Sequence, residues 1–351
     1  MGGGSWCPLA GLCDTERDIR LPEADTLVRY RWLTSAFGAA ITLCLGACSS
    51  TTATESTHEF SGTPKLVLQI TVDQLRGDLP TRYYDRLGES GFRFLWENGV
   101  VYRNAHHAHA NTETVVGHTT LATGAHPSAH GMVANLWFDR ETGYTTYNVE
   151  DPDYRLLTVG ADVDEGAEID PTQRAARSEG RSPAAILVST FADELRSNTS
   201  GRAKAIGVSV KDRGAITMAG HSGTAYWFSK ASGEFVTSTY YMDRYPDWVT
   251  EFNAGRPAQQ FANTSWTLLH DQESYLFGDS DDRPWETDVA GFGRVFPHAY
   301  GDGTSRYFTT FLTLGPAGDR LVLDFAKQAL VSEQLGSDAV SYTHLRAHET
   351  R

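Results

Sequence analysis

The chain has 351 residues, of which 40% are apolar and 11% aromatic, and its formal net charge at pH 7 is −14. This apolar content supports a large buried core and excludes an intrinsically disordered chain. The length fits one large domain, or one domain with an inserted cap. The acidic balance, with no basic stripe to interrupt it, argues against nucleic acid as the main partner.

The N-terminal segment has the pattern of a bacterial lipoprotein signal peptide. Residues 1–27 resemble neither a signal nor a domain, and we interpret them as an over-long gene start. Within residues 28–48, Arg29 and Arg31 form a basic region, an apolar run follows, and the last four residues, LGAC, fit a lipoprotein cleavage box. The apolar run is short for a stable membrane span, and a buried helix is the alternative interpretation. The pattern predicts lipid attachment at Cys48.

No cysteine falls in the plausible folded domain. The four cysteines are Cys7, Cys13, Cys44 and Cys48, so this domain has no disulfide and no cysteine-based zinc site. Residues 49–62 are rich in Ser and Thr and predict a flexible tether. We therefore expect a lipoprotein of the bacterial periplasm that is held at the outer membrane through its lipid alone.

The first predicted strand ends on a carboxylate. Residues 66–72, LVLQITV, form an apolar run with β-branched residues, which indicates a parallel strand covered on both faces. Ligands of open α/β sheets bind at the carboxyl ends of such strands, where Asp73 lies. Asp73 could cap the following turn or ligate a metal ion.

A hydroxyl residue stands at the start of the next predicted helix. Thr114 lies where an irregular segment gives way to the helix-compatible run VVGHTTLATG. Such a hydroxyl can cap the first free N–H groups, and this use is favoured when the stretch is taken alone. The same N–H groups and the helix dipole also favour an anion, either an alkoxide or a phosphate. Asn135, just beyond the turn at Pro127, offers an amide donor.

Six of the twelve histidines lie between His106 and His130, which suggests a metal cluster. We favour another interpretation for them. His118 follows Thr114 by four residues and shares its helix face, which indicates packing or hydrogen bonding. The other histidines of this stretch are likewise not expected to ligate metal.

Two cations follow a second predicted strand. The run AKAIGVSV leads into Lys211 and Arg213, which alternate onto one face as two cations gripping one anion should. Residues 151–183, which precede it, are acidic and turn-rich and predict a surface excursion. Residues 224–241 predict a hairpin that turns at 231–233. A nucleophile, a carboxylate, an amide donor and a cationic clamp are thus all expected at strand ends.

Several stretches, in this order, resemble the alkaline phosphatase superfamily, specifically its threonine-dependent PafA-type periplasmic alkaline phosphatases. They include TVDQLRGD, TETVVGH, LATGAHPSAHGMVANLWFDRETG and VSVKDR. The resemblance runs from about Lys65 to Val340. It implies an α/β/α sandwich with a mostly parallel central sheet and an inserted cap region.

The resemblance also implies roles for particular residues. Thr114 is the nucleophile, and Asp73 and Thr114 are ligands of zinc, of which two ions are expected. The phosphate is contacted by Asn135, Lys211 and Arg213. The chain has Val115-Val116 where the family often has Gly-Pro, a departure that reshapes the loop beside the nucleophile but leaves Thr114 in place.

The function implied is zinc-dependent hydrolysis of small-molecule phosphate monoesters through a phosphothreonine. The alternative enzyme is a type I nucleotide pyrophosphatase/phosphodiesterase, which shares the threonine, the asparagine and the metal scaffold. A monoester is a dianion, so the two cations Lys211 and Arg213 favour the monoesterase. A surface lipoprotein that binds phosphorylated ligands without turnover is the alternative from another class.

The C-terminal residues break the pattern. LVLDFAKQALVSEQLG predicts a helix, but residues 340–351 fit neither helix nor strand, and their reverse translation resembles the end of a transposon-type sequencing adapter. We interpret them as a foreign tail and expect residues 63–339 to be the N-terminal part of a longer catalytic domain. The resemblance places most of the zinc ligands, two Asp/His pairs and one more His, beyond residue 339. The chain by itself is therefore expected to be an inactive, incomplete fold.

Overall fold

The computed structural model describes residues 64–337 and 341–347. The predicted signal peptide, the lipidation site Cys48 and the tether over 49–62 lie outside these residues and stay predictions. None of the described helices is both long and apolar enough to cross a membrane.

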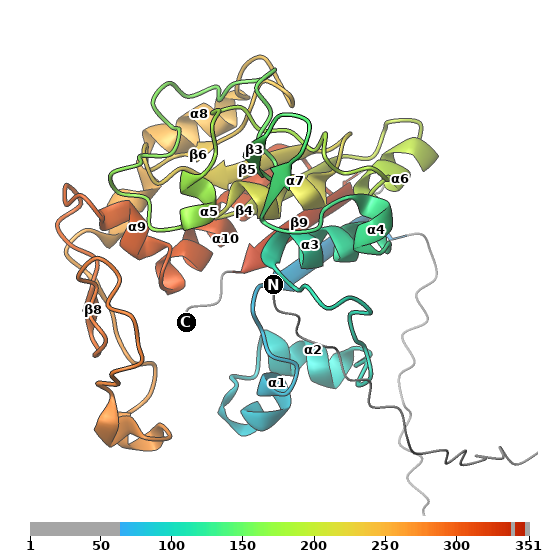
Figure 1. The fold of residues 1–351 in the computed structure, drawn as a ribbon. Helices are drawn as coiled ribbons and strands as arrows, with labels where there is room; N and C mark the ends of the chain where they lie inside the picture. Colours follow the sequence, from blue (N-terminus) through green and yellow to red (C-terminus); the bar gives the residue numbers. More distant parts are fainter. Residues whose placement is uncertain (1–63, 338–340, 348–351) are drawn as a thin grey trace, which may run out of the picture. The chain divides into compact units, whose positions relative to one another are not determined.

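The centre of the fold is a five-stranded sheet with the strand order β1-β9-β4-β5-β6 (Figure 1). The first four strands are parallel, and the last runs antiparallel to its neighbour through a turn at 229–234, which confirms the hairpin predicted there. The strands are β1 (Leu66–Val72), β4 (Ala205–Ser209), β5 (Thr224–Phe228), β6 (Phe235–Val236) and β9 (Ser341–Ala347).

One face of the sheet is covered by α7 (Asp212–Ala219), against which α3 (Thr114–Thr123) and α6 (Phe191–Asn198) pack. Val115 and Val116 of α3 are fully buried and share a core cluster with Ile216 of α7 and Trp227 of β5. The close approach of α7 requires Gly207 in β4, because a Cβ there would lie 2.3 Å from the carbonyl oxygen of Ala215. Through Val115 and Val116, α3 packs onto the layer that α7 forms on the sheet.

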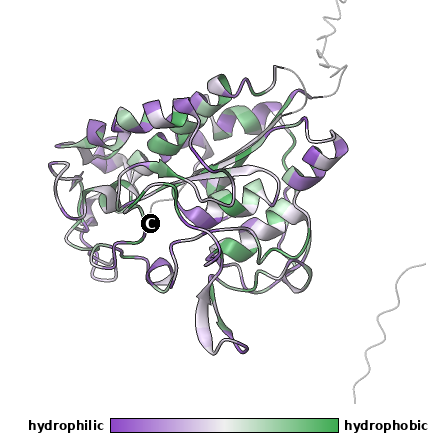
Figure 2. Ribbon diagram, turned by 90° about the horizontal axis from the view of Figure 1, so that it is seen from above, coloured by the Kyte–Doolittle hydropathy of each residue, from purple (hydrophilic) through white to green (hydrophobic). Residues whose placement is uncertain are grey.

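The opposite face is covered by α10 (Pro316–Ser332), with α8 (Asp247–Ala254) and α9 (Phe308–Leu312) beside it. Phe325 of α10 stacks on Phe235 at 4.2 Å between ring centroids and lies 5.2 Å from Tyr226. Because neighbouring strand residues point to opposite faces, Tyr226 packs on the α10 side while Trp227 packs on the α7 side. The three layers confirm the predicted α/β/α sandwich, and Figure 2 shows polar and apolar residues alternating along the covering helices.

The remaining elements are short and lie in the connections. The hairpin β2 (Leu136–Asp139) and β3 (Tyr144–Tyr147) follows α3 and α4 (Pro127–His130), and β7 (Ser265–Trp266) pairs with β8 (His298–Ala299) in the long segment between β6 and α9. The others are α1 (Leu79–Arg82), η1 (Tyr84–Arg86), α2 (Phe92–Asn98), α5 (Pro171–Arg174), η2 (Pro257–Phe261), η3 (Gln272–Ser274) and η4 (Gly278–Ser280).

The prediction that β1 is covered on both faces is wrong. Leu68 and Ile70 are 48% and 50% exposed. The physical reason is the position of the strand, since β1 is at the edge of the described sheet and α10 packs on β9 and β4 instead. Val67, on the other face, packs in a small cluster with Ala192 and Leu195 of α6.

The prediction that the residues after 339 form neither helix nor strand is also wrong for 341–347. This segment forms β9, which lies between β1 and β4 and pairs in parallel with both. Both neighbours would otherwise present unpaired backbone N–H and C=O groups along one side. The side chain of Thr343, at the middle of β9, is buried. Whether the segment is foreign stays a prediction.

Candidate active site

Thr114 is the first residue of α3, as the sequence predicted, but it does not cap the helix. The N-cap residue is Glu113, whose side chain makes no capping hydrogen bond. Instead, the side-chain oxygen of Asn135 accepts a hydrogen bond from the N–H of Val115 at 3.1 Å. The Thr114 side chain is partly buried, and within the described residues its hydroxyl has no hydrogen-bond partner. The capping role favoured by the local stretch therefore belongs to Asn135, and the Thr114 hydroxyl is available for chemistry.

Asn135 is held at three points. Its N–H donates to Oε2 of Glu113 at 2.5 Å, and its carbonyl oxygen accepts from Nδ2 of Asn148 at 2.7 Å. Its side-chain Oδ1 accepts from Val115. Because Oδ1 is engaged as an acceptor, the Nδ2 group is the end of the amide that can donate to an anion.

The alternating pattern suggested that Lys211 and Arg213 extend the strand, but they lie beyond its end. β4 ends at Ser209, Lys211 is the N-cap of α7, and Arg213 is the second residue of that helix. The two side chains nevertheless converge on one anionic atom, Oδ2 of Asp170, with Nζ of Lys211 at 2.5 Å and Nη2 of Arg213 at 3.1 Å. Both cations thus contact one carboxylate oxygen of the protein at a helix N-terminus, and their contact with a phosphate stays a prediction.

Asp170 was missed by sequence reasoning, which placed it in a surface excursion. It is the N-cap of α5, and its Oδ1 accepts hydrogen bonds from the backbone N–H of Thr172 at 2.9 Å and from the Thr172 hydroxyl at 2.6 Å. Burial by itself raises the pKa of Asp170, but the Arg213 and Lys211 cations outweigh it and hold the pKa well below its usual range. The carboxylate is therefore ionised at neutral pH. The one local signal for it is Asp-Pro-Thr, an N-cap pattern.

The guanidinium of Arg213 is buried, with 4% of its side chain exposed. Its Nη1 donates to the hydroxyls of Thr172 at 2.9 Å and Tyr147 at 3.3 Å. The Tyr147 hydroxyl in turn donates to Asp212 at 2.6 Å, and Nε of Arg181 donates to the other oxygen of Asp212 at 2.7 Å. Burial by itself lowers the pKa of Arg213, but its anionic and hydroxyl neighbours outweigh this and raise the pKa above its ordinary value. The network thus fixes a permanent positive charge at the site.

Asp73 follows β1 directly and is buried, with 8% of the residue exposed. Its place at the carboxyl end of β1 is confirmed, while its role as a zinc ligand is not tested. Within residues 64–337 and 341–347 no group of three or more His, Cys, Asp or Glu side chains is arranged to hold a metal ion. A zinc ion takes about four ligands. Asp73 and Thr114 supply at most two, so a zinc ion would need further ligands.

Two of the clustered histidines, His118 and His130, make hydrogen bonds within or beside α3 and α4. Nδ1 of His118 donates to the carbonyl oxygen of Thr114 at 2.8 Å, which confirms the hydrogen-bonding role predicted for it. His130 is buried, its Nδ1 accepts from the N–H of Met132 at 3.1 Å, and its Nε2 lies 3.0 Å from the Thr120 hydroxyl. Burial lowers the pKa of His130, so it is neutral at pH 7.

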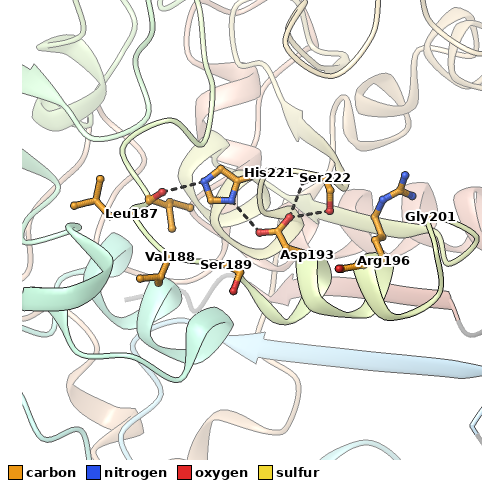
Figure 3. A pocket seen from close by; sticks show the side chains of 10 residues that line it. Leu187, Val188, Ser189, Asp193, Arg196, Gly201, His221 and Ser222 are labelled. Atoms are coloured by element: carbon orange, nitrogen blue, oxygen red, sulfur yellow. Dashed lines mark hydrogen bonds and ion pairs between the residues drawn. The ribbon is translucent and has the colours of Figure 1, made fainter.

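A cavity of about 590 Å³ lies elsewhere, along α6 (Figure 3). Three of its polar residues, Asp193, His221 and Ser222, are hydrogen-bonded to one another. The carboxylate of Asp193 accepts from Nδ1 of His221 at 2.9 Å, from the Ser222 hydroxyl at 2.8 Å and from the N–H of Thr190 at 2.9 Å. These bonds tie α6 to the turn after α7. None of the predicted site residues lines this cavity, so we place the candidate active site at the N-termini of α3 and α7.

Comparisons with known proteins show the family of the chain. The family model for type I phosphodiesterase / nucleotide pyrophosphatase matches residues 67–286. Alkaline phosphatase PhoV of Synechococcus elongatus is 36% identical over 275 residues, which cover 78% of this chain and 47% of that protein. Alkaline phosphatase PafA of Elizabethkingia meningoseptica is 34% identical over 283 residues, which cover 79% and 49%. The chain spans about half the length of these curated relatives.

The structure of the chain is similar to the crystal structure of wild-type PafA, with a TM-score of 0.71 and 32% identity over 82% of this chain and 53% of that one. A second similar structure is a variant of PafA in which a threonine, an asparagine, a lysine and an arginine are replaced. The chain therefore belongs to the type I phosphodiesterase / nucleotide pyrophosphatase family. Its relatives are PafA-type members of the alkaline phosphatase superfamily, which confirms the resemblance found in the sequence.

Proposed function

We propose that the complete protein hydrolyses small-molecule phosphate monoesters through a phosphothreonine at Thr114. The observation that carries the proposal is the convergence of Lys211 and Arg213 on one anionic oxygen. It occurs at the N-terminus of α7, and α7 packs against the helix that Thr114 begins. A clamp of two cations suits a dianionic ester, and the N-terminal N–H groups of both helices add to it.

The PafA variant supports the same four residues. Its replaced threonine and asparagine are 21 residues apart, and its replaced lysine and arginine are two apart. The present chain has Thr114 and Asn135 at the first separation, and Lys211 and Arg213 at the second. These pairs of equal spacing support the assignment of all four to one site.

The chemistry proposed for these residues follows from their positions. The Thr114 hydroxyl would lose its proton as its oxygen attacks phosphorus, a P–O bond would form to Thr114, and the bond to the leaving group would break, with its oxygen taking up a proton to leave as the alcohol. Nδ2 of Asn135 and the two cations would hold the equatorial phosphate oxygens, where negative charge persists through the transition state. Water would then hydrolyse the phosphothreonine and release phosphate. The proposal includes two zinc ions with Asp73 and Thr114 among their ligands, since bound zinc would neutralise charge and make an alkoxide accessible.

The second candidate function is hydrolysis of phosphodiesters or nucleotide pyrophosphates, and the family model favours it. A diester carries one charge fewer and a second organic group. The paired cations favour the monoester.

The proposal also covers location. The protein would be attached to lipid at Cys48 and anchored to the outer membrane in the periplasm, with no membrane contact beyond the lipid.

The test is an assay of the complete protein on an aryl phosphate and an aryl phosphodiester, with and without a chelator. We expect faster hydrolysis of the monoester and loss of activity with the chelator. Faster hydrolysis of the diester would overturn the monoesterase assignment. Binding of inorganic phosphate without hydrolysis of either ester would identify a binding protein instead.

A further inference from the structure

A third charged side chain, Asp170, lies between the two cations Lys211 and Arg213. We propose that Asp170 is a positioning residue that holds Lys211 and Arg213 in a single geometry toward phosphate, an inference that rests on the proposed function. One carboxylate oxygen, Oδ2, bridges Nζ of Lys211 and Nη2 of Arg213 at 2.5 and 3.1 Å. A lysine ammonium has four rotatable bonds behind it, so a fixed anion is needed to keep it beside the guanidinium.

Asp170 is itself fixed through its other oxygen. Oδ1 accepts both the N–H and the hydroxyl of Thr172, and the N–H of Asp170 donates to Oε1 of Glu168 at 2.7 Å. Glu168 is anchored in turn by Nζ of Lys230 at 2.5 Å. The carboxylate therefore cannot turn away from the two cations without breaking the cap of α5. This rigidity is what a positioning group requires, and a carboxylate that is displaced whenever substrate binds would lack it.

Donors remain for an anion after Asp170 is bound. Nε of Arg213 is buried and has no hydrogen-bond partner among the described residues. Nη1 is engaged by Thr172 and Tyr147 and Nη2 by Asp170, so Nε is the donor that the described contacts leave over. A guanidinium can bind two anions at different hydrogens. The ion pair with Asp170 therefore does not use every donor of Arg213, and a phosphate would reach Nε once the buried group becomes accessible.

The test uses Asp170→Asn in the complete protein. An asparagine keeps the N-cap of α5 but removes the charge that holds the cations. We expect kcat/KM for an aryl phosphate to fall about tenfold to hundredfold, inorganic phosphate to inhibit less strongly, and hydrolysis of an aryl phosphodiester to change less. In a Lys211→Ala background the same substitution should have only a small further effect, because its main target is gone.

The matched control is Asp302→Asn. Asp302 accepts from the N–H and hydroxyl of Thr304, both at 2.9 Å, which is the same Asp-x-Thr arrangement without a cation within ion-pair distance among the described residues. The Asp302→Asn variant should hydrolyse the aryl phosphate at the wild-type rate. Tighter binding of phosphate by Asp170→Asn with undiminished hydrolysis would show competition and overturn the inference, as would equal losses with and without Lys211. An inactive wild-type protein would instead refute the proposed function.

Discussion

The side-chain oxygen of Asn135 accepts the N–H of Val115 at 3.1 Å and so caps α3 from outside the helix. This contact joins residues 20 positions apart and orients the amide of Asn135. It also gives a hydrogen-bond acceptor to one of the N–H groups at the start of α3, so the Thr114 hydroxyl is not needed as the cap. The first turn of α3 therefore presents both a hydroxyl and an oriented amide to a ligand.

Thr114→Ala in the complete protein should abolish phosphoenzyme formation. Because the hydroxyl has no hydrogen-bond partner among the described residues, stability should change by less than about 0.5 kcal/mol. Mass spectrometry of the protein quenched during turnover would detect the phosphothreonine. The control is Thr112→Ala, two residues upstream and exposed, which should react normally. A phosphothreonine that survives in Thr114→Ala would refute the assignment.

Lys211→Ala should lower monoesterase activity far more than diesterase activity. A charge-assisted hydrogen bond contributes about 2–3 kcal/mol, so a loss of about 30- to 150-fold is expected on the monoester. Steady-state kinetics on both substrates measure the difference. Equal losses on the two substrates would count against the monoesterase assignment.

Arg213 needs a different substitution, since it is buried among Tyr147, Asp170 and Asp212. Removing it would leave buried partners uncompensated, at a cost of about 3–5 kcal/mol in stability. Arg213→Lys keeps the charge but loses the planar guanidinium. We expect the fold to persist and the monoesterase activity to fall, as measured by kinetics together with thermal unfolding. Full activity in this variant would show that the planar guanidinium is not used.

Asn135→Asp and Asn135→Ala should separate capping from catalysis. The aspartate keeps an acceptor for the N–H of Val115 but replaces the Nδ2 donor with negative charge, so activity should fall while stability is kept. The alanine loses both functions and should also cost about 0.5–2 kcal/mol in stability. Thermal unfolding and monoester kinetics of the two variants distinguish these effects. Wild-type activity in Asn135→Asp would exclude the amide as a phosphate donor.

His221 and Asp193 should make stability depend on pH. The hydrogen bond to Asp193 raises the pKa of His221 and outweighs its burial. A raised pKa means that the stabilisation is complete below the unfolded value, about 6.5, and is lost as the pH rises through the folded value. Asp193 behaves oppositely. Burial raises its pKa, but hydrogen bonds from His221, Thr190 and Ser222 prevail and hold it well below its usual range, so its contribution is lost only in acid.

The measurement is the melting temperature of wild type and His221→Gln at about pH 5.5 and about pH 9. The gap between the two proteins should be larger at the lower pH. A gap that is the same at both values would show that the charge of His221 contributes nothing. The contribution of the His221–Asp193 pair to the free energy of unfolding should be small, because the His221 side chain is 36% exposed and solvent screens the pair.

Residues 64–337 and 341–347 should not hold two zinc ions tightly by themselves. The described residues contain no group of three or more metal-ligating side chains, and Asp73 and Thr114 supply at most two ligands. Equilibrium dialysis against zinc measures the stoichiometry, with Asp73→Asn as the comparison. Two tightly bound zinc ions per chain would contradict the prediction.

The sequence by itself determined the elements whose pattern is local. The helix that begins at Thr114, the hairpin that turns at 231–233 and the strand that ends before Asp73 were all predicted from periodicity and turn residues. The pairing of Lys211 with Arg213 was also visible, because two cations two residues apart reach one ligand from either a strand end or a helix start. Neighbouring residues decide such features, so the sequence suffices for them.

Tertiary structure alone decided which residues far apart in the sequence contact one another. Asp170 lies 41 residues before Lys211, and only the folded path of that segment brings its carboxylate to the cations. The capping of α3 by Asn135 and the insertion of β9 between β1 and β4 also join distant segments. Contacts of this kind depend on how layers pack, and hydrophobic patterning within one element carries no record of which distant polar group will lie opposite it.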